Sequence, residues 1–166
     1  MADSGINIVQ SCLDLQDALI AKINELLSEM QFEKSDGNTV MGATGYRQQL
    51  PILMQDDEDP DQFFPGYIVR IKGGRTQTDA DPWDVTVDII FGCYSDDNAN
   101  DGHLIILGMI KAITEYFQVY PLLDHKYRAL QDMGFNIQDE DTYPYFYGDV
   151  EMKFWVQRAR REDEYS

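Results

Sequence analysis

The stretch YPYFYGDVEMKFWV, residues 143–156, constrains the fold most, because apolar and polar side chains alternate along most of its length. Successive side chains of a β-strand point to opposite faces of a sheet, so strict alternation predicts one buried face and one solvent-facing face. The buried set consists of Phe146, Val150, Met152, Phe154 and Val156. Tyr147, Asp149, Glu151 and Lys153 form the opposite set. The stretch therefore predicts a long, half-buried strand and offers no nucleophile, base or metal-ligand set of its own.

Three further segments show strand patterns. Residues 83–94, WDVTVDIIFGCY, alternate as regularly as the first stretch. Residues 66–74, GYIVRIKGG, precede them, and the Gly-rich connection with RTQTDADP indicates an antiparallel pair. A weaker pattern covers residues 126–138 and is interrupted by Gly134. The sequence thus predicts about four strands.

Two segments have the periodicity of amphipathic helices. Residues 4–31 carry apolar side chains on one helical stripe, and Asp3 or Ser4 is suited to cap the first amides. Residues 103–120 form the second segment, apolar nearly all round in its first turns and stopped by Pro121. We expect both helices to cover one face of the sheet.

The order of these elements favours an α+β fold. It shows helix, strands, helix and strands without regular βαβ alternation, which predicts an antiparallel, or mixed, sheet of about four strands packed against two helices. A length of 166 residues fits a single domain over residues 1–166. Residues 35–64 lack periodicity and predict a long loop excursion, and residues 158–166 predict a flexible, charged C-terminal tail.

Charge restricts the classes of partner. Thirty acidic residues against thirteen Lys and Arg give a formal net charge of −17, so duplex DNA and anionic membranes should repel the chain. The longest apolar run, Leu104 to Leu107, is far too short to span a bilayer, so no membrane association is expected. Cys12 and Cys93 lie in apolar patterns without metal-ligand spacing, which predicts reduced core thiols of an intracellular protein.

No segment predicts an enzyme, a metal site or a cofactor site. Asp96, Asn98 and Asn100 match the start of a calcium-binding loop, but Asp101 and Leu107 occupy the positions that need glycine and glutamate. The loop is better interpreted as one that leads into a helix, with its acids near the positive end of the helix dipole. The acidic run at residues 56–61 is interpreted as a solvated loop, and His103 and His125 as surface or capping residues.

The order of several motifs resembles one known family. The segment QDEDTYP followed by YFYGDVEMKFWV is similar to the aromatic-rich C-terminal strand of bacteriophage tail terminator, or tail completion, proteins. The segment WDVTVDIIFGCYSDDNANDGHLIILGMIKAI resembles their strand, acidic loop and helix, so the resemblance covers about residues 66–157.

The resemblance implies a structural virion protein rather than an enzyme. Members of this family form hexameric rings that cap the tail tube and join it to the neck, or connector, below the head. It implies a homo-hexamer as the working form, tail tube and neck proteins as partners, and viral DNA that passes through without specific binding. The expected location is the virion tail or neck, after assembly in the cytoplasm of the bacterial host. Six copies of a chain of charge −17 carry a formal charge of about −102, which would repel DNA in the channel.

Two sets of residues are candidates for these roles. Contacts with neighbouring subunits or the tube are assigned to Tyr46, Arg47, Leu50, Ile52, Leu104, Ile105, Arg158 and Arg160. An acidic face toward the channel or solvent is assigned to Asp56, Asp57, Glu58, Asp59, Asp96, Asp97 and Asp101. Two other functions stay open on the sequence: another neck component, such as a head-completion or stopper protein, and an acidic inhibitor that imitates DNA in the basic groove of a host enzyme.

Overall fold

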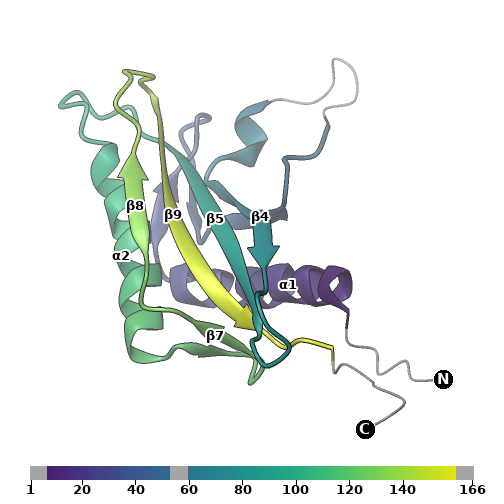
Figure 1. Ribbon diagram of the computed structural model, residues 1–166. Helices are drawn as coiled ribbons and strands as arrows, with labels where there is room; N and C mark the ends of the chain where they lie inside the picture. The colour runs from purple at the N-terminus through teal and green to yellow at the C-terminus, as the bar shows by residue number, and fades with distance from the viewer. Residues whose placement is uncertain (1–6, 53–59, 160–166) are drawn as a thin grey trace, which may run out of the picture.

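Two long antiparallel strands form the centre of the sheet. In the computed structural model, which describes residues 7–52 and 60–159, they are β5 (Trp83–Tyr94) and β9 (Tyr145–Val156) (Figure 1). Their register runs without a break from Trp83 opposite Val156 to Tyr94 opposite Tyr145. The two alternating patterns of the sequence are therefore confirmed as strands, and the structure pairs them with each other.

The other elements are shorter or flank this pair. In chain order they are α1 (Ile8–Leu27), β1 (Gln31–Glu33), β2 (Thr39–Met41), β3 (Thr44–Arg47), the 3₁₀ turn η2 (Pro60–Phe63), β4 (Gly66–Arg75), α2 (His103–Val119), β6 (Leu122–Leu123), β7 (Tyr127–Ala129) and β8 (Gly134–Ile137). The outer edge of β5 pairs with β4 and, at one residue, with β1. The outer edge of β9 pairs with β8 and β7. Every pairing is antiparallel except that β3 runs parallel to β4.

The predicted sheet of about four strands is wrong, although the α+β class and the two helices agree with the structure. Nine strands occur in the described part of the chain, and they form one sheet. The strands that sequence analysis missed are two to four residues long, too short to display a period of two. The segment predicted as a loop excursion, residues 35–64, contains β2, β3 and η2, and the pattern over residues 126–138 divides into β7 and β8.

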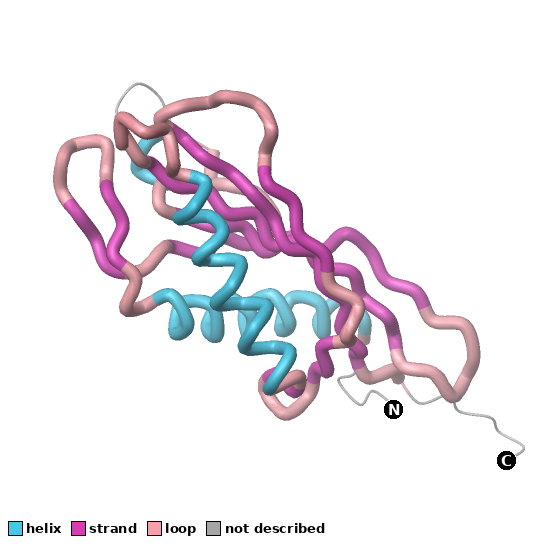
Figure 2. The backbone as a smooth tube through the Cα atoms, turned by 90° about the vertical axis from the view of Figure 1, so that its left-hand side faces the viewer, coloured by secondary structure: helices cyan, strands magenta, loops and turns pink. Residues whose placement is uncertain are grey.

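Both helices lie on the same face of the sheet, as Figure 2 shows. The side chains of β5 and β9 that face them are buried, and so is the facing stripe of each helix. The most deeply buried members are Leu15, Leu19, Ile23, Leu27, Val85, Val87, Ile89, Phe91, Ile106, Met109, Ile113, Phe117, Val150, Met152, Phe154 and Val156. Neither α1 nor α2 covers the opposite face of β5 and β9, and we call it the open sheet face.

Gly148 allows α2 to approach the sheet closely. A Cβ atom at this position would lie 2.5 Å from Ile106 Cγ2 and 2.9 Å from Asn136 O, distances that real side chains do not tolerate. Gly148 is buried in β9, opposite Phe91 of β5 and Ile137 of β8. The break in alternation at this residue of the sequence is therefore the contact point between helix and sheet.

The first helix is shorter than the sequence predicts. It begins after Asn7, whose side-chain oxygen accepts a hydrogen bond from Gln10 N at 2.8 Å, so the cap is Asn7 rather than Asp3 or Ser4. The helix ends at Leu27, because the residues from Gln31 onward pair with β2 instead of continuing the helix. Residues 1–6, which include the predicted caps, lie outside the described residues.

Two glutamine side chains join α1 to the edge of the sheet. The buried Gln16 of α1 donates from Nε2 to Val69 O and to Gln48 Oε1, both at 2.9 Å. Gln48, with φ of +67°, accepts from Ile71 N at 2.9 Å and donates to Ile71 O at 3.0 Å. The Gln48 amide therefore replaces a backbone amide beside β4, at the point where β3 has ended.

The core position predicted for the two cysteines is found fully for one residue and in part for the other. Both thiols are free; Cys93 is buried and Cys12 is half-buried. Burial raises the pKa of the Cys93 thiol to about 12, which keeps it protonated. Neither described helix combines the length and apolarity required to cross a bilayer.

Adjacent residues of β9 allow the two faces of the sheet to be compared directly. Phe154 is fully buried and packs edge-to-face on Phe117 of α2, with ring centroids 5.8 Å apart, whereas Trp155 is 45% exposed on the open sheet face. We predict that Phe154→Ala lowers the free energy of unfolding by about 3–5 kcal/mol. Trp155→Ala, the matched control, should cost about 1 kcal/mol or less. Urea titration followed by circular dichroism measures both, and equal losses would contradict the assignment of the two faces.

Candidate functional site

Two acidic loops meet at one end of the sheet. The β5–α2 loop, residues 95–102, and the β8–β9 loop, residues 138–144, both lie at the upper end of the molecule in Figure 1. They are joined by two hydrogen bonds, from Ser95 N to Pro144 O at 2.9 Å and from Tyr143 Oη to Asp96 O at 2.7 Å. The register of β5 and β9 causes this meeting, because Tyr94 at the end of one strand faces Tyr145 at the start of the other.

The two loops carry acidic side chains without basic ones. The exposed acids are Asp96, Asp97, Asp101, Asp139, Glu140 and Asp141, and neither loop contains Lys or Arg. We call these six residues the acidic end. Sequence analysis selected the first three, and the run QDED was the signal for the others. Their proximity depends on the pairing of distant strands, which the sequence does not display.

The acidic end has no geometry suited to a metal ion. Within the described chain, no three His, Cys, Asp or Glu residues are grouped so that they could hold one. Asp97 Oδ1 accepts from Ala99 N at 3.2 Å and Asp141 Oδ1 accepts from Tyr143 N at 3.2 Å, so these carboxylates shape their own loops. The N-cap of α2 is Gly102, without a side-chain cap. The predicted proximity of the acids to this helix is thus found, but they do not cap it.

Aromatic side chains support the acidic end from the open sheet face. Phe64, which follows η2, packs on Tyr145 and Tyr147 with ring centroids 5.0 Å and 5.8 Å away. Tyr145 Oη also donates a hydrogen bond to Asp61 Oδ1. These contacts hold η2 beside the acidic end and give the aromatics of β9 a packing role.

The open sheet face is balanced in charge, unlike the rest of the chain. Directly opposite residues of neighbouring strands share a face, so the register identifies its charged members. They are Arg70, Lys72, Arg75, Arg128 and Lys153 against Glu33, Asp84, Asp88, Asp149 and Glu151. Because the whole chain has a charge of −17, its acidic excess lies outside this face.

The predicted contact residues fall into two separate regions. Arg47, Leu50 and Ile52 are exposed in or after β3, and Ile52 is 84% exposed. Tyr46 is half-buried and packs edge-to-face on Phe63, with ring centroids 5.6 Å apart.

The second region is at the start of α2. Leu104 is 57% exposed there, and Ile105 packs partly against the core. Figure 1 places α2 beside the β8 edge of the sheet, whereas the segment that follows β3 lies near the β4 edge. The structure therefore does not bring the two regions of one chain together. Asp56, Asp57, Glu58, Asp59 and Arg160 lie outside the described residues.

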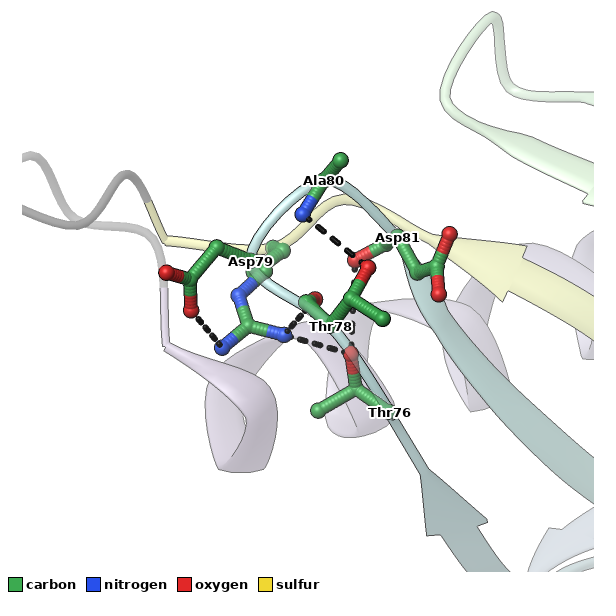
Figure 3. A network of polar contacts seen from close by, with 6 residues as sticks. Thr76, Thr78, Asp79, Ala80 and Asp81 are labelled. Carbon is green, nitrogen blue, oxygen red and sulfur yellow. Dashed lines mark hydrogen bonds and ion pairs between the residues drawn. The ribbon is translucent and has the colours of Figure 1, made fainter.

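Arg158 makes contacts within its own chain. Its Nη1 donates to Thr76 Oγ1 at 2.6 Å and to Thr78 O at 2.7 Å, and its Nη2 lies 3.7 Å from Asp79 Oδ1 (Figure 3). These groups belong to the β4–β5 loop, which reaches the end of β9 because Trp83 faces Val156. Arg158, predicted at an interface and at the start of a flexible tail, thus fastens the end of β9 to this loop.

The Arg158 contacts predict a measurable coupling. Arg158→Ala should lower the free energy of unfolding by about 1 kcal/mol, because it removes charge-assisted hydrogen bonds that are partly exposed to solvent. Thr76→Val removes one acceptor, and the double variant should lose less than the sum of the two single losses. Arg75→Ala, which removes a positive charge from an exposed residue of the same hairpin, is the control. Strict additivity in denaturant titrations would show that the bond contributes nothing.

No protein-family model matches the chain, and no curated protein sequence matches it.

Proposed function

We propose that the chain is a structural protein of a bacteriophage tail that assembles into a ring, as a tail terminator does. The observation that carries the proposal is the position of two strand edges on opposite sides of the central sheet. In the strand order β3–β4–β5–β9–β8, the described residues pair β3 only with β4 and β8 only with β9. A closed ring needs two different, complementary surfaces on each subunit, one on either side.

Exposed apolar side chains accompany both edges. Leu50 and Ile52, 39% and 84% exposed, follow β3. On the other side, Phe135 of β8 is 57% exposed, and so is Leu104 of α2. Edge strands with exposed apolar neighbours are the usual places where a sheet gains a partner. We assign the first pair to one side of the subunit contact and the second pair to the other.

The acidic end supports a channel role. Its six acidic residues are exposed at one end of the subunit, without basic residues in either loop. Repeated around a ring, they would surround the DNA path with charges of the same sign as the phosphates. DNA would then pass through without being retained. The expected partners are the tail tube protein and a neck protein, and the expected location is the virion.

The ring itself is tested by mass and by shape. Static light scattering after gel filtration should give about six subunits, and negative-stain images should show annular particles. Ile52→Asp should reduce the mass to that of a monomer while leaving the circular dichroism spectrum unchanged, because a buried charge in the contact is costly. Val119→Asp, at an exposed apolar residue at the opposite end of α2 from Leu104, should leave rings intact.

The same measurements separate the other two functions. If the wild type is a monomer and binds a cationic host enzyme with an affinity that falls steeply as salt increases, the result would favour the DNA-mimic inhibitor over the ring-forming protein. Rings located by labelled antibody elsewhere in the virion neck would favour another neck component.

The channel role has its own test. Changing the six acids of the acidic end to Asn or Gln should leave ring formation intact and increase affinity for duplex DNA at low salt, measured by fluorescence anisotropy. In infection, the variant should slow DNA ejection. The control neutralises acids of α1, at Asp14, Asp17 and Glu25, in the same ring. Equal DNA affinity for both variants, or a normal ejection rate, would remove the acidic end from the channel.

A further inference from the structure

Two carboxyl groups lie side by side near the middle of the open sheet face. Asp88 of β5 faces Glu151 of β9 and Arg70 of β4, and Asp149 is the diagonal neighbour of Asp88, two residues before Glu151. The side chain of Asp149 lies within hydrogen-bonding reach of that of Asp88. A hydrogen bond between two carboxyl groups requires a proton on one of them, because an ionised carboxylate only accepts. The pair is thus arranged to hold one proton between two strands.

The nearby basic side chains make their hydrogen bonds and ion pairs with groups other than Asp88 and Asp149. Lys72 Nζ lies 2.9 Å from Glu151 Oε2 and Lys153 Nζ lies 3.1 Å from Asp132 Oδ2. Arg70, the register partner of Asp88, donates from Nε to Gln48 O at 3.1 Å and from Nη2 to Gln49 Oε1 at 3.2 Å.

The other neighbouring side chains do not compensate the negative charge of Asp88 and Asp149. Asp84 lies four residues before Asp88 on the same face and adds another acid. Strand β8 contributes Asn136 opposite Asp149 and has no titratable side chain. Among the described residues, Asp88 Oδ1 is buried without a hydrogen-bond partner. The charge of Lys72 reaches Asp88, but it does not outweigh the burial of Asp88 and the influence of Asp149.

We propose that Asp88 and Asp149 share one proton across the β5–β9 pairing, and that loss of this proton as pH rises through neutrality weakens the pairing of the two central strands. The pair is a pH-sensitive device built into the open sheet face. It acts in the single chain and does not depend on ring formation.

The electrostatic environment sets the range in which this device works. The pKa of Asp88 is raised to about 7, first by burial, then by the hydrogen bond to Asp149 and by the charge of Asp149. Glu151 raises it further, and Lys72 opposes the shift. An aspartate in the unfolded chain titrates near 3.9, so the folded state binds the proton more tightly than the unfolded state. The stability that this proton contributes is complete when the pH is below the pKa of aspartate in the unfolded chain. It is lost as the pH rises from that pKa to the folded-state pKa of about 7.

Asp88→Asn tests the proposal because an amide keeps the shape of the side chain and cannot ionise. The folding equilibrium constant of the wild type, divided by that of Asp88→Asn, should fall by about tenfold between about pH 5 and pH 8, less than the full shift allows because the site is partly exposed. Denaturant titrations across this range measure the ratio. Asp84→Asn, on the same strand and the same face but outside the pair, should follow the wild-type pH profile. Parallel profiles for the wild type and Asp88→Asn would overturn the proposal.

A direct titration keeps the test independent of how well the variants fold. In the wild type, the side-chain carboxyl carbon of Asp88, followed by NMR, should titrate near neutral pH. In Asp149→Asn the Asp88 titration should move to lower pH, since the neighbouring negative charge is gone. Amide hydrogen exchange in the middle of β5 and β9, corrected for the intrinsic pH dependence of exchange, should show lower protection above neutral pH in the wild type and not in Asp88→Asn. An Asp88 titration near pH 4 in the wild type would refute the shared proton.

Discussion

The unbroken pairing of β5 with β9 is the constraint on which the rest of the structure depends. Twelve residues on each strand match one to one, and this register fixes what lies at both ends and on both faces. It gives α1 and α2 a continuous apolar surface to cover, and it leaves an opposite face on which charges and aromatics are arranged in pairs. A shift by one residue would exchange the two faces, so the helices and this register depend on each other.

The long elements could be predicted from the sequence because each contains several repeats of its own period. The strand over residues 83–94 and the helix at 103–119 were placed within one residue of their observed ends. The short strands could not be predicted in this way. Leu122–Leu123 or Thr44–Arg47 become strands because a neighbouring edge offers unpaired backbone groups, which is a property of the assembled sheet.

The same distinction explains which parts of the candidate site could be predicted. Asp96, Asp97 and Asp101 were recognisable as a local acidic loop. Residues 139–141 join them only because two strands distant in sequence end at the same level. Arg158 was assigned to a contact between subunits for a similar reason: a basic residue near the end of a chain gives no sign that the β4–β5 loop lies beside it. The Asp88–Asp149 pair likewise appears in the sequence as two polar positions of two separate alternating patterns.

Gln48 has a consequence for how the sheet could grow. Its side-chain amide occupies both backbone groups of Ile71, so the edge of β4 next to β3 is closed at that residue. A strand from another molecule cannot pair with β4 at this residue in a different register, because the Gln48 amide already bonds the backbone groups that it would need. Such a strand has to pair with the four residues of β3 instead, so the backbone of β3 defines its register independently of its side chains.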